Sequence, residues 1–72
     1  MYKETLGSKL KMARLKAGYT QQQIAKEINT TQSQLSKIEN NELEPNIETL
    51  GKLIDFYEVS ADWVLGTGIT KR

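Results

Sequence analysis

Two helix-capping patterns, placed eleven residues apart, constrain this 72-residue chain more than any other feature. Thr20 is followed three residues later by Gln23, and Thr31 is followed in the same way by Gln34. In such a capping box, the threonine hydroxyl and the glutamine side chain satisfy backbone N–H groups that a helix start leaves unpaired. Two starts so close together leave room for one short helix and a tight turn, so the sequence predicts a helix-turn-helix.

Apolar residues at helical spacing extend this prediction to a compact five-helix bundle. We expect helices over residues 5–17, 21–28, 32–40 and 46–57, and a short fifth helix that Ser60 caps and Gly66 ends. The side chains expected to line the core are Leu6, Leu10, Ala13, Ala17, Ile24, Ala25, Ile28, Leu35, Ile38, Ile47, Leu50, Leu53, Ile54, Tyr57 and Trp63. No segment shows the two-residue period of a strand. The fold class is therefore all-α.

At this length the chain should form one domain, which we place at residues 1–66, followed by a flexible tail over residues 67–72. One residue of the predicted core has an alternative. If Trp63 were exposed near the end of the fifth helix, it would suggest a dimer contact instead.

The outward face of the predicted third helix differs from an ordinary solvated face. At about 100° per residue, Ser33, Ser36, Lys37 and Asn40 share that face, and Gln32 lies at its edge. A solvated helix face more often carries Lys and Glu, whereas this one is mostly uncharged and rich in hydrogen-bonding groups. Because the second helix of a helix-turn-helix can lie in the DNA major groove, this face is a candidate reading surface.

The net charge of +1 conceals an uneven distribution. Residues 1–38 hold seven Lys or Arg against two acids, and residues 39–72 hold three against seven. Solvated helix faces could explain such a split by themselves. Together with the helix-turn-helix, it favours a polyanion that meets the N-terminal half.

Composition argues against catalysis and against a membrane protein. The chain has no His and no Cys, so the usual imidazole bases, thiolates and metal ligands are absent, and it has no glycine-rich phosphate loop. We therefore expect no enzyme activity, no metal and no cofactor. The apolar stretches are too short to cross a bilayer, and residues 1–19 carry charge throughout, unlike a signal peptide. The expected location is cytoplasmic.

Four segments make the chain resemble a Cro/CI-type (XRE family) helix-turn-helix domain. They are residues 18–25, 34–39, 45–50 and 59–66. Each segment is weak alone, but the four occur in order at matching spacing. The resemblance covers about residues 6–66, and it implies a lambda-repressor-like five-helix fold and sequence-specific DNA binding.

The resemblance also assigns base-reading roles by position. Gln32, Ser33 and Lys37 match positions that touch base edges in the family. Glutamine offers a donor and an acceptor together, which suits bidentate pairing with adenine. Lysine can reach guanine acceptors or a phosphate.

Further roles implied by the resemblance concern the support of the third helix. Gln21 matches a glutamine that contacts a phosphate and braces the recognition helix, and Asn40 matches a position that contacts the DNA backbone. Arg14 and Glu39 match a recurrent pair that ties the first helix to the third.

Two asparagines depart from the family pattern. Asn29 replaces the usual glycine of the turn, and Asn41 replaces the glycine after the third helix. Asparagine tolerates a positive φ better than most residues, so we expect small stability costs and an unchanged fold.

The sequence is best interpreted as a DNA-binding transcriptional regulator, a repressor that binds a two-fold operator as a homodimer with the third helix in the major groove. Its expected partners are double-stranded DNA and a second copy of the chain, with no small-molecule ligand evident. The alternative is a protein-binding adapter or antitoxin-type module, whose acidic C-terminal half docks a basic partner.

Overall fold

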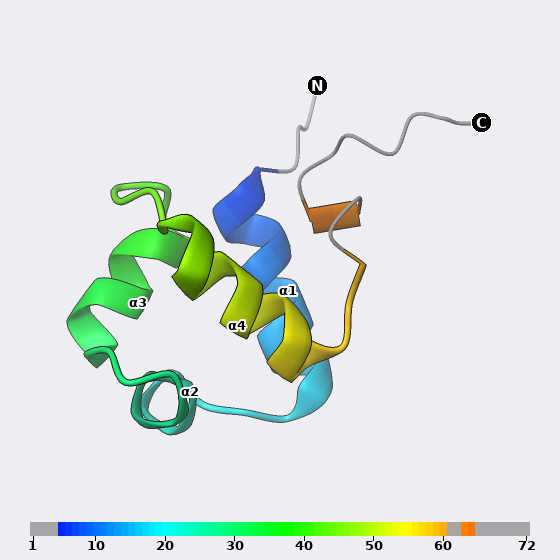
Figure 1. The fold of residues 1–72 in the computed structure, drawn as a ribbon, viewed down its shortest axis with the longest axis horizontal. Coiled ribbons are helices and arrows are strands. Elements are labelled where there is room, and N and C mark those ends of the chain that lie inside the picture. Colours follow the sequence, from blue (N-terminus) through cyan, green and yellow to red (C-terminus); the bar gives the residue numbers. More distant parts are fainter. Residues whose placement is uncertain (1–4, 61–62, 65–72) are drawn as a thin grey trace.

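The computed structural model describes residues 5–60 and 63–64, and Figure 1 shows its ribbon. Four helices follow one another as α1 (Leu6–Ala17), α2 (Gln21–Glu27), α3 (Gln32–Glu39) and α4 (Ile47–Tyr57). The described residues contain no strand, so the all-α prediction is confirmed. None of the described helices combines the length and apolarity needed to span a bilayer.

Only the start of the predicted fifth helix falls within the described residues. The Ser60 hydroxyl accepts a hydrogen bond from the Trp63 backbone N–H at 3.0 Å, and the Val64 N–H donates to the Ser60 carbonyl at 3.1 Å. These are the contacts of a capped first turn. Residues 61–62 and 65–66, and the predicted tail over residues 67–72, lie outside the described residues.

The two predicted capping boxes form to different extents. At α2, the Thr20 hydroxyl accepts from the Gln23 N–H at 3.1 Å, and Gln23 Oε1 accepts from the Thr20 N–H at 2.8 Å. At α3, Thr31 accepts from the Gln34 N–H at 3.1 Å, but Gln34 Oε1 accepts from the Thr30 hydroxyl at 2.6 Å. The second box is therefore half formed, because the neighbouring hydroxyl offers the Gln34 oxygen an alternative donor.

Positive φ angles follow each of the first three helices, at Gly18 and at the two asparagines that depart from the family pattern. Gly18 has a φ of 86°, Asn29 of 61° and Asn41 of 64°. The Asn41 side chain also joins two elements, because Oδ1 accepts from the Gly7 N–H at 3.0 Å and Nδ2 donates to the Thr5 hydroxyl at 2.7 Å. Asn41 thus fixes the end of α3 to the start of α1, which a glycine could not do.

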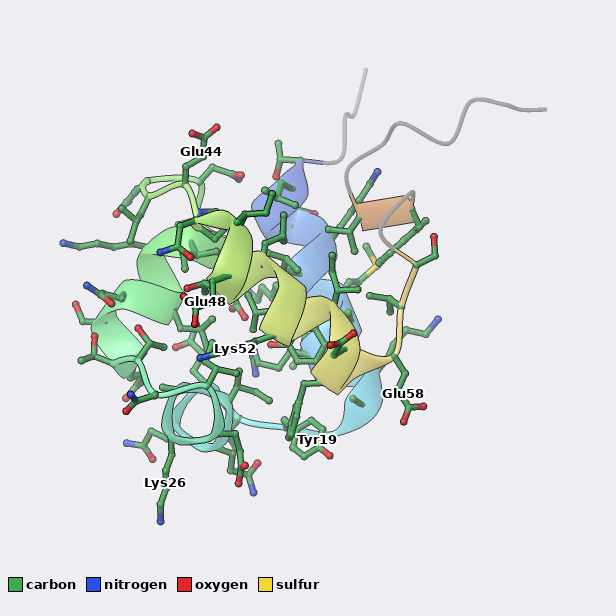
Figure 2. All side chains as sticks on the ribbon, viewed as in Figure 1. Tyr19, Lys26, Glu44, Glu48, Lys52 and Glu58 are labelled. Atoms are coloured by element: carbon green, nitrogen blue, oxygen red, sulfur yellow. The ribbon has the colours of Figure 1, made fainter. Side chains whose placement is uncertain are left out.

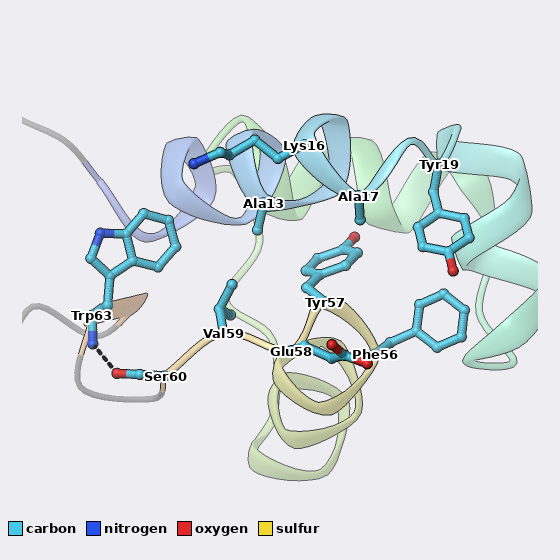
Figure 3. A pocket seen from close by; sticks show the side chains of 10 residues that line it. All are labelled: Ala13, Lys16, Ala17, Tyr19, Phe56, Tyr57, Glu58, Val59, Ser60 and Trp63. Carbon is cyan, nitrogen blue, oxygen red and sulfur yellow. Dashed lines mark hydrogen bonds between the residues drawn. The ribbon is translucent and has the colours of Figure 1, made fainter.

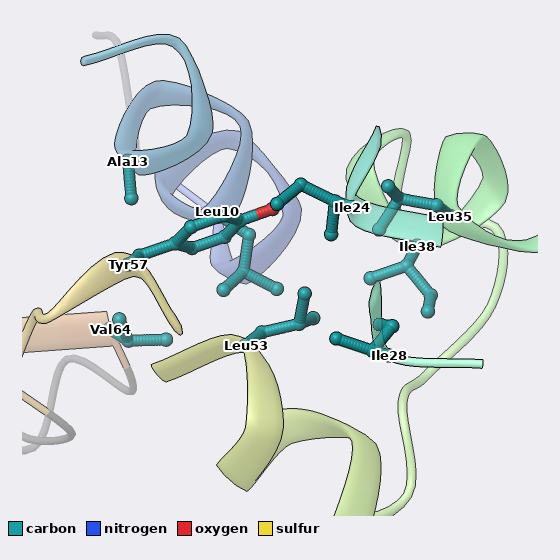
Figure 4. Packing of buried hydrophobic residues seen from close by; sticks show 9 residues of the cluster. All are labelled: Leu10, Ala13, Ile24, Ile28, Leu35, Ile38, Leu53, Tyr57 and Val64. Atoms are coloured by element: carbon teal, nitrogen blue, oxygen red, sulfur yellow. The ribbon is translucent and has the colours of Figure 1, made fainter. Parts of the chain in front are cut away.

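The core lies between the helices, where side chains of α1, α2, α3 and α4 pack together with Val64 (Figure 4). Its buried members are Leu10, Ala13, Ile24, Ile28, Leu35, Ile38, Leu53, Tyr57 and Val64. Each helix therefore contributes the apolar face that its sequence period predicts. The predicted positions Leu6, Leu50 and Ile54 are half-buried and pack against this cluster.

Three predicted core residues are exposed. Ile47 is 88% exposed because it is the first residue of α4, where a side chain extends past the packed part of the helix. Ala17 is exposed in the last turn of α1. Trp63 is 40% exposed, and its neighbour Val64 enters the core with 1% exposure instead. The Trp63 ring lies 5.8 Å from the Lys9 ammonium, a cation–π distance.

Two helices approach each other closely at Gly7, where α1 meets the end of α3. A Cβ at this position would lie 2.6 Å from the Glu39 carbonyl oxygen and would also collide with the Ile38 carbonyl oxygen. Only glycine permits this spacing, and the spacing brings Arg14 of α1 within reach of the Glu39 side chain.

Candidate nucleic-acid interface

The outward face of α3 presents polar side chains to solvent. Gln32, Ser33, Lys37 and Asn40 are all exposed. On the opposite side of the helix, Leu35 is completely buried and fixes the rotation of α3 about its axis. The four residues predicted to contact DNA on this helix therefore lie on one accessible surface.

The helices α2 and α3 begin next to each other. Gln21 is the first residue of α2 and Gln32 the first of α3, and Gln32 Nε2 donates to Gln21 Oε1 at 3.4 Å. Neither helix has an acidic residue in its first turn. The positive dipole end of α3 therefore faces solvent, and no carboxylate of its first turn neutralises it. A helix end of this kind can bind a phosphate.

A buried ion pair connects α3 to α1 on the side of α3 that faces the core. Arg14 Nε donates to Glu39 Oε2 at 2.8 Å, and Arg14 Nη2 donates to Glu39 Oε1 at 3.2 Å. The side chains of Arg14 and Glu39 are only 8% and 1% exposed. Arg14 Nη1 also donates to the Tyr19 carbonyl at 2.8 Å, at the turn that leads into α2. The pair thus joins α1, the α1–α2 turn and the last residue of α3.

Gln21 connects the ion pair to the exposed surface. Its Nε2 donates to Glu39 Oε1 at 3.0 Å, while its Oε1 accepts from Gln32. A continuous series of hydrogen bonds therefore runs from Arg14 through Glu39 and Gln21 to Gln32. The resemblance paired Arg14 with Glu39 and gave Gln21 a bracing role, but it did not place Gln21 on the Glu39 carboxylate.

The Tyr57 hydroxyl is buried beside this network. It has no hydrogen-bond partner among the described residues. Burial raises the pKa of Tyr57, the negative charge of Glu39 raises it further, and the Arg14 charge partly offsets both effects. Tyr57 therefore remains a neutral phenol at physiological pH.

Several acidic side chains follow α3, on the loop after it and on α4. Glu42 and Glu44 lie on the loop after α3, and Glu48 lies in the first turn of α4, where Lys52 approaches it at 3.7 Å (Figure 2). The last turn of α2 carries Lys26, which projects into solvent. The basic excess of residues 1–38 therefore lies on α1, α2 and α3, and the acidic excess of residues 39–72 lies mainly on the loop after α3 and on α4.

A shallow cleft of about 650 Å³ lies between the C-terminal half of α1 and the end of α4 (Figure 3). Tyr19 and Phe56 form one wall, with ring centroids 4.9 Å apart, and Trp63 lies at the other end. Lys16 and Glu58 are the charged residues of its lining. No residue of α2 or α3 lines it, so it is separate from the outward face of α3.

Comparison with known proteins places this arrangement in context. A model of the family described as "Helix-turn-helix" matches residues 10–64. The HTH-type transcriptional regulator ImmR of Bacillus subtilis (strain 168) is 45% identical over 62 residues, which cover 86% of this chain and 49% of ImmR. The SPbeta prophage-derived uncharacterized HTH-type transcriptional regulator YonR of the same organism is 37% identical over 59 residues, or 82% of this chain and 55% of YonR.

The chain thus spans about half the length of the curated relatives it matches. Among solved structures, it is similar to the P22 c2 repressor protein in complex with synthetic operator 9T in the presence of Tl⁺. The TM-score is 0.81 and the identity 27%, and the match covers 88% of this chain and 96% of the other. The lambda-repressor-like fold predicted from the sequence is therefore confirmed, although only four of its five predicted helices fall within the described residues.

Proposed function

Because the chain belongs to the Cro/CI-type (XRE) helix-turn-helix family, we propose that it is a sequence-specific DNA-binding regulator that represses transcription. The family is one of transcription regulators rather than of enzymes. In this proposal the protein acts in the cytoplasm.

In this proposal α3 enters the major groove. Gln32, Ser33 and Lys37 contact base edges, while Gln21 and Asn40 contact phosphates. One observation carries the proposal: an exposed polar face of α3 begins beside α2 and is held there by hydrogen bonds that lead back to the buried Arg14–Glu39 ion pair. Such rigid support is what a base-reading side chain needs, since a misplaced donor or acceptor loses its pairing geometry.

We further propose that two copies bind a two-fold operator. A single module of this size buries roughly 600–1,000 Å² on DNA, which limits its affinity, and a second copy with a half-site about one helical turn away doubles the contact. The exposed Trp63 at the end of the α1–α4 cleft is our candidate for the contact between copies. Trp63→Ala should then weaken binding to a full operator more than binding to a half-site, as measured by mobility shift.

Binding-site selection from a random DNA pool tests the reading surface. Gln32→Ala should cost about 1–3 kcal/mol on the preferred site and relax the preference at one base pair per half-site. Gln21→Ala should weaken the affinity for all sequences through the lost phosphate contact, and it should alter the selected sequence only if Gln21 also orients Gln32. Because Gln21 is neutral, that change should leave the salt dependence of binding nearly unchanged, unlike Lys37→Ala if Lys37 also neutralises a phosphate.

The base-reading role of Gln32 is wrong if Gln32→Ala lowers affinity uniformly without altering the selected sequence. A symmetrical selected site would support the dimer, and an unsymmetrical site of one half-site length would contradict it.

A protein-binding adapter or antitoxin-type module is the second candidate function, and one surface favours it. Leu43 and Ile47 are 40% and 88% exposed, and they alternate along the chain with the exposed residues Glu42, Glu44 and Glu48. Exposed apolar side chains flanked by acidic residues fit a partner that presents apolar and basic side chains. Binding to random duplex at rising salt separates the two functions, because steep salt dependence indicates DNA binding and flat or absent binding indicates the adapter.

A further inference from the structure

We propose that Glu39 is a positioning residue for base reading, in addition to its ion pair with Arg14. Its carboxylate sets the orientation of the Gln21 amide, and Gln21 in turn sets the orientation of the Gln32 amide. This inference rests on the proposed function, because it specifies how the base-reading side chain acquires its donor and acceptor arrangement.

The first step follows from the chemistry of the carboxylate. A glutamine amide can present either its oxygen or its nitrogen, but an ionised carboxylate only accepts hydrogen bonds. Glu39 Oε1 lies 3.0 Å from the Gln21 amide nitrogen, and the Glu39 side chain is 1% exposed. Gln21 must therefore present Nε2 to Glu39, since the opposite orientation would bring an amide oxygen against the buried carboxylate, with two acceptors in contact and no donor between them.

The second step transfers this orientation to α3. With Nε2 directed at Glu39, Gln21 Oε1 is directed at Gln32 and accepts from Gln32 Nε2 at 3.4 Å. Gln32 then has one remaining N–H and its own Oε1 for the DNA. A donor and an acceptor side by side are what the N7 and N6 groups of adenine require.

The opposite orientation of Gln21 would change what Gln32 offers. Gln21 would then donate to Gln32 Oε1, and the two N–H groups of Gln32 would both be free. Two donors suit the O6 and N7 acceptors of guanine better than the edge of adenine. The buried carboxylate thus distinguishes between two reading states of the same exposed side chain.

Arg14 holds the carboxylate in place. Its two hydrogen bonds, at 2.8 and 3.2 Å, occupy both oxygens of Glu39 and restrict rotation of the carboxylate plane. However, Arg14 does not itself determine which end of the Gln21 amide faces inward. Changes at Arg14 and at Glu39 should therefore differ in their effect on base preference, even where both lower stability.

The test compares Glu39→Gln with Arg14→Lys. Glu39→Gln keeps the shape but replaces an obligate acceptor with an amide that can donate or accept, whereas Arg14→Lys retains the carboxylate and a positive partner. Discrimination is measured by equilibrium binding to the selected site and to its variants at the base pair that Gln32→Ala relaxes. The binding of each variant is measured at a temperature well below the midpoint of its thermal unfolding, so that the chain is folded.

For the wild-type chain, a bidentate contact predicts roughly 5- to 150-fold discrimination at this base pair. Glu39→Gln should reduce that factor by about threefold or more, because both orientations of Gln21 become populated. Arg14→Lys should lower the unfolding midpoint but reduce the discrimination less than Glu39→Gln does, because the obligate acceptor is retained. Unchanged discrimination in Glu39→Gln, or an equal loss in Arg14→Lys, would overturn the inference.

A measurement on the wild-type chain covers the case in which Glu39→Gln does not fold. The side-chain amide of Gln21 should have a ¹⁵N order parameter close to that of the rigid backbone, roughly 0.85, whereas the exposed amide of Gln22 should fall below roughly 0.6. Equal mobility of the two amides would overturn the inference. If the wild-type chain selects no DNA sequence at all, the proposed function fails instead.

Discussion

The contact between α1 and α3 at Gly7 makes a sharp prediction about stability. An ordinary contact of a Cβ begins at 3.4 Å, whereas a Cβ on Gly7 would lie 2.6 Å from the Glu39 carbonyl oxygen. Gly7→Ala must therefore move α1 and α3 apart by at least about 0.8 Å at this point, because the Ile38 carbonyl oxygen would lie closer still. The atoms it meets are backbone atoms of a helix, which cannot rotate away as a side chain can.

Overpacking of this kind costs about 1–3 kcal/mol of folding free energy. The gain in helix propensity from Gly to Ala is at most about 1 kcal/mol, and Gly7 lies in the first turn, where the gain is smaller. We expect Gly7→Ala to lower the free energy of unfolding by about 1–3 kcal/mol. For a domain of this size, that corresponds to roughly 4–8 °C in Tm for each kcal/mol.

Gly51 provides a matched control in the interior of α4. A Cβ there would meet no atom within 4 Å, so Gly51→Ala should raise the free energy of unfolding by about 0.5–1 kcal/mol. Urea unfolding followed by far-UV circular dichroism measures both variants. If Gly7→Ala stabilised the chain as much as Gly51→Ala, the helices would not be in the close contact described here.

Three further pairs of measurements test other contacts. Glu39→Ala should lower the free energy of unfolding by about 3–5 kcal/mol, because Arg14 stays buried without its counter-charge. Glu42→Ala, in the exposed loop, should change it by no more than about 0.5 kcal/mol. Equal melting temperatures of the two variants would contradict the buried pair. Asn29→Gly should stabilise the chain by relieving a positive φ, but Asn41→Gly should destabilise it, since its side-chain bonds at 3.0 and 2.7 Å are lost; the same sign for both would refute the bridging role. Above about pH 10 the tyrosine of the unfolded chain ionises while the buried Tyr57, whose pKa is raised, stays protonated, so the free energy of unfolding should fall as pH rises. This fall should be smaller in Tyr57→Phe. Urea unfolding of both chains at about pH 8 and about pH 11 measures it, and an equal fall in the two chains would count against the raised pKa.

The sequence by itself determined the elements and their ends. Thr20, Thr31 and Asn46 are capping residues whose side chains act on backbone within three residues, so their effect can be derived without a fold. The same holds for Gly18 and for the asparagines with positive φ. Helical periodicity likewise identified most of the core, because it reports which face of each helix is apolar. The pairing of Arg14 with Glu39 came only with the family resemblance.

Only the tertiary structure decided the contacts between elements. The exposure of Ile47 and Trp63 depends on where α4 begins and where residues 63–64 lie relative to the bundle, and periodicity carries no information about that. The need for glycine at position 7 arises from backbone atoms of α3 that lie more than thirty residues away. The orientation of the Gln21 amide depends on a carboxylate that packing buries beneath it. These features depend on distances between helices, and a sequence pattern specifies the faces of helices rather than the distances between them.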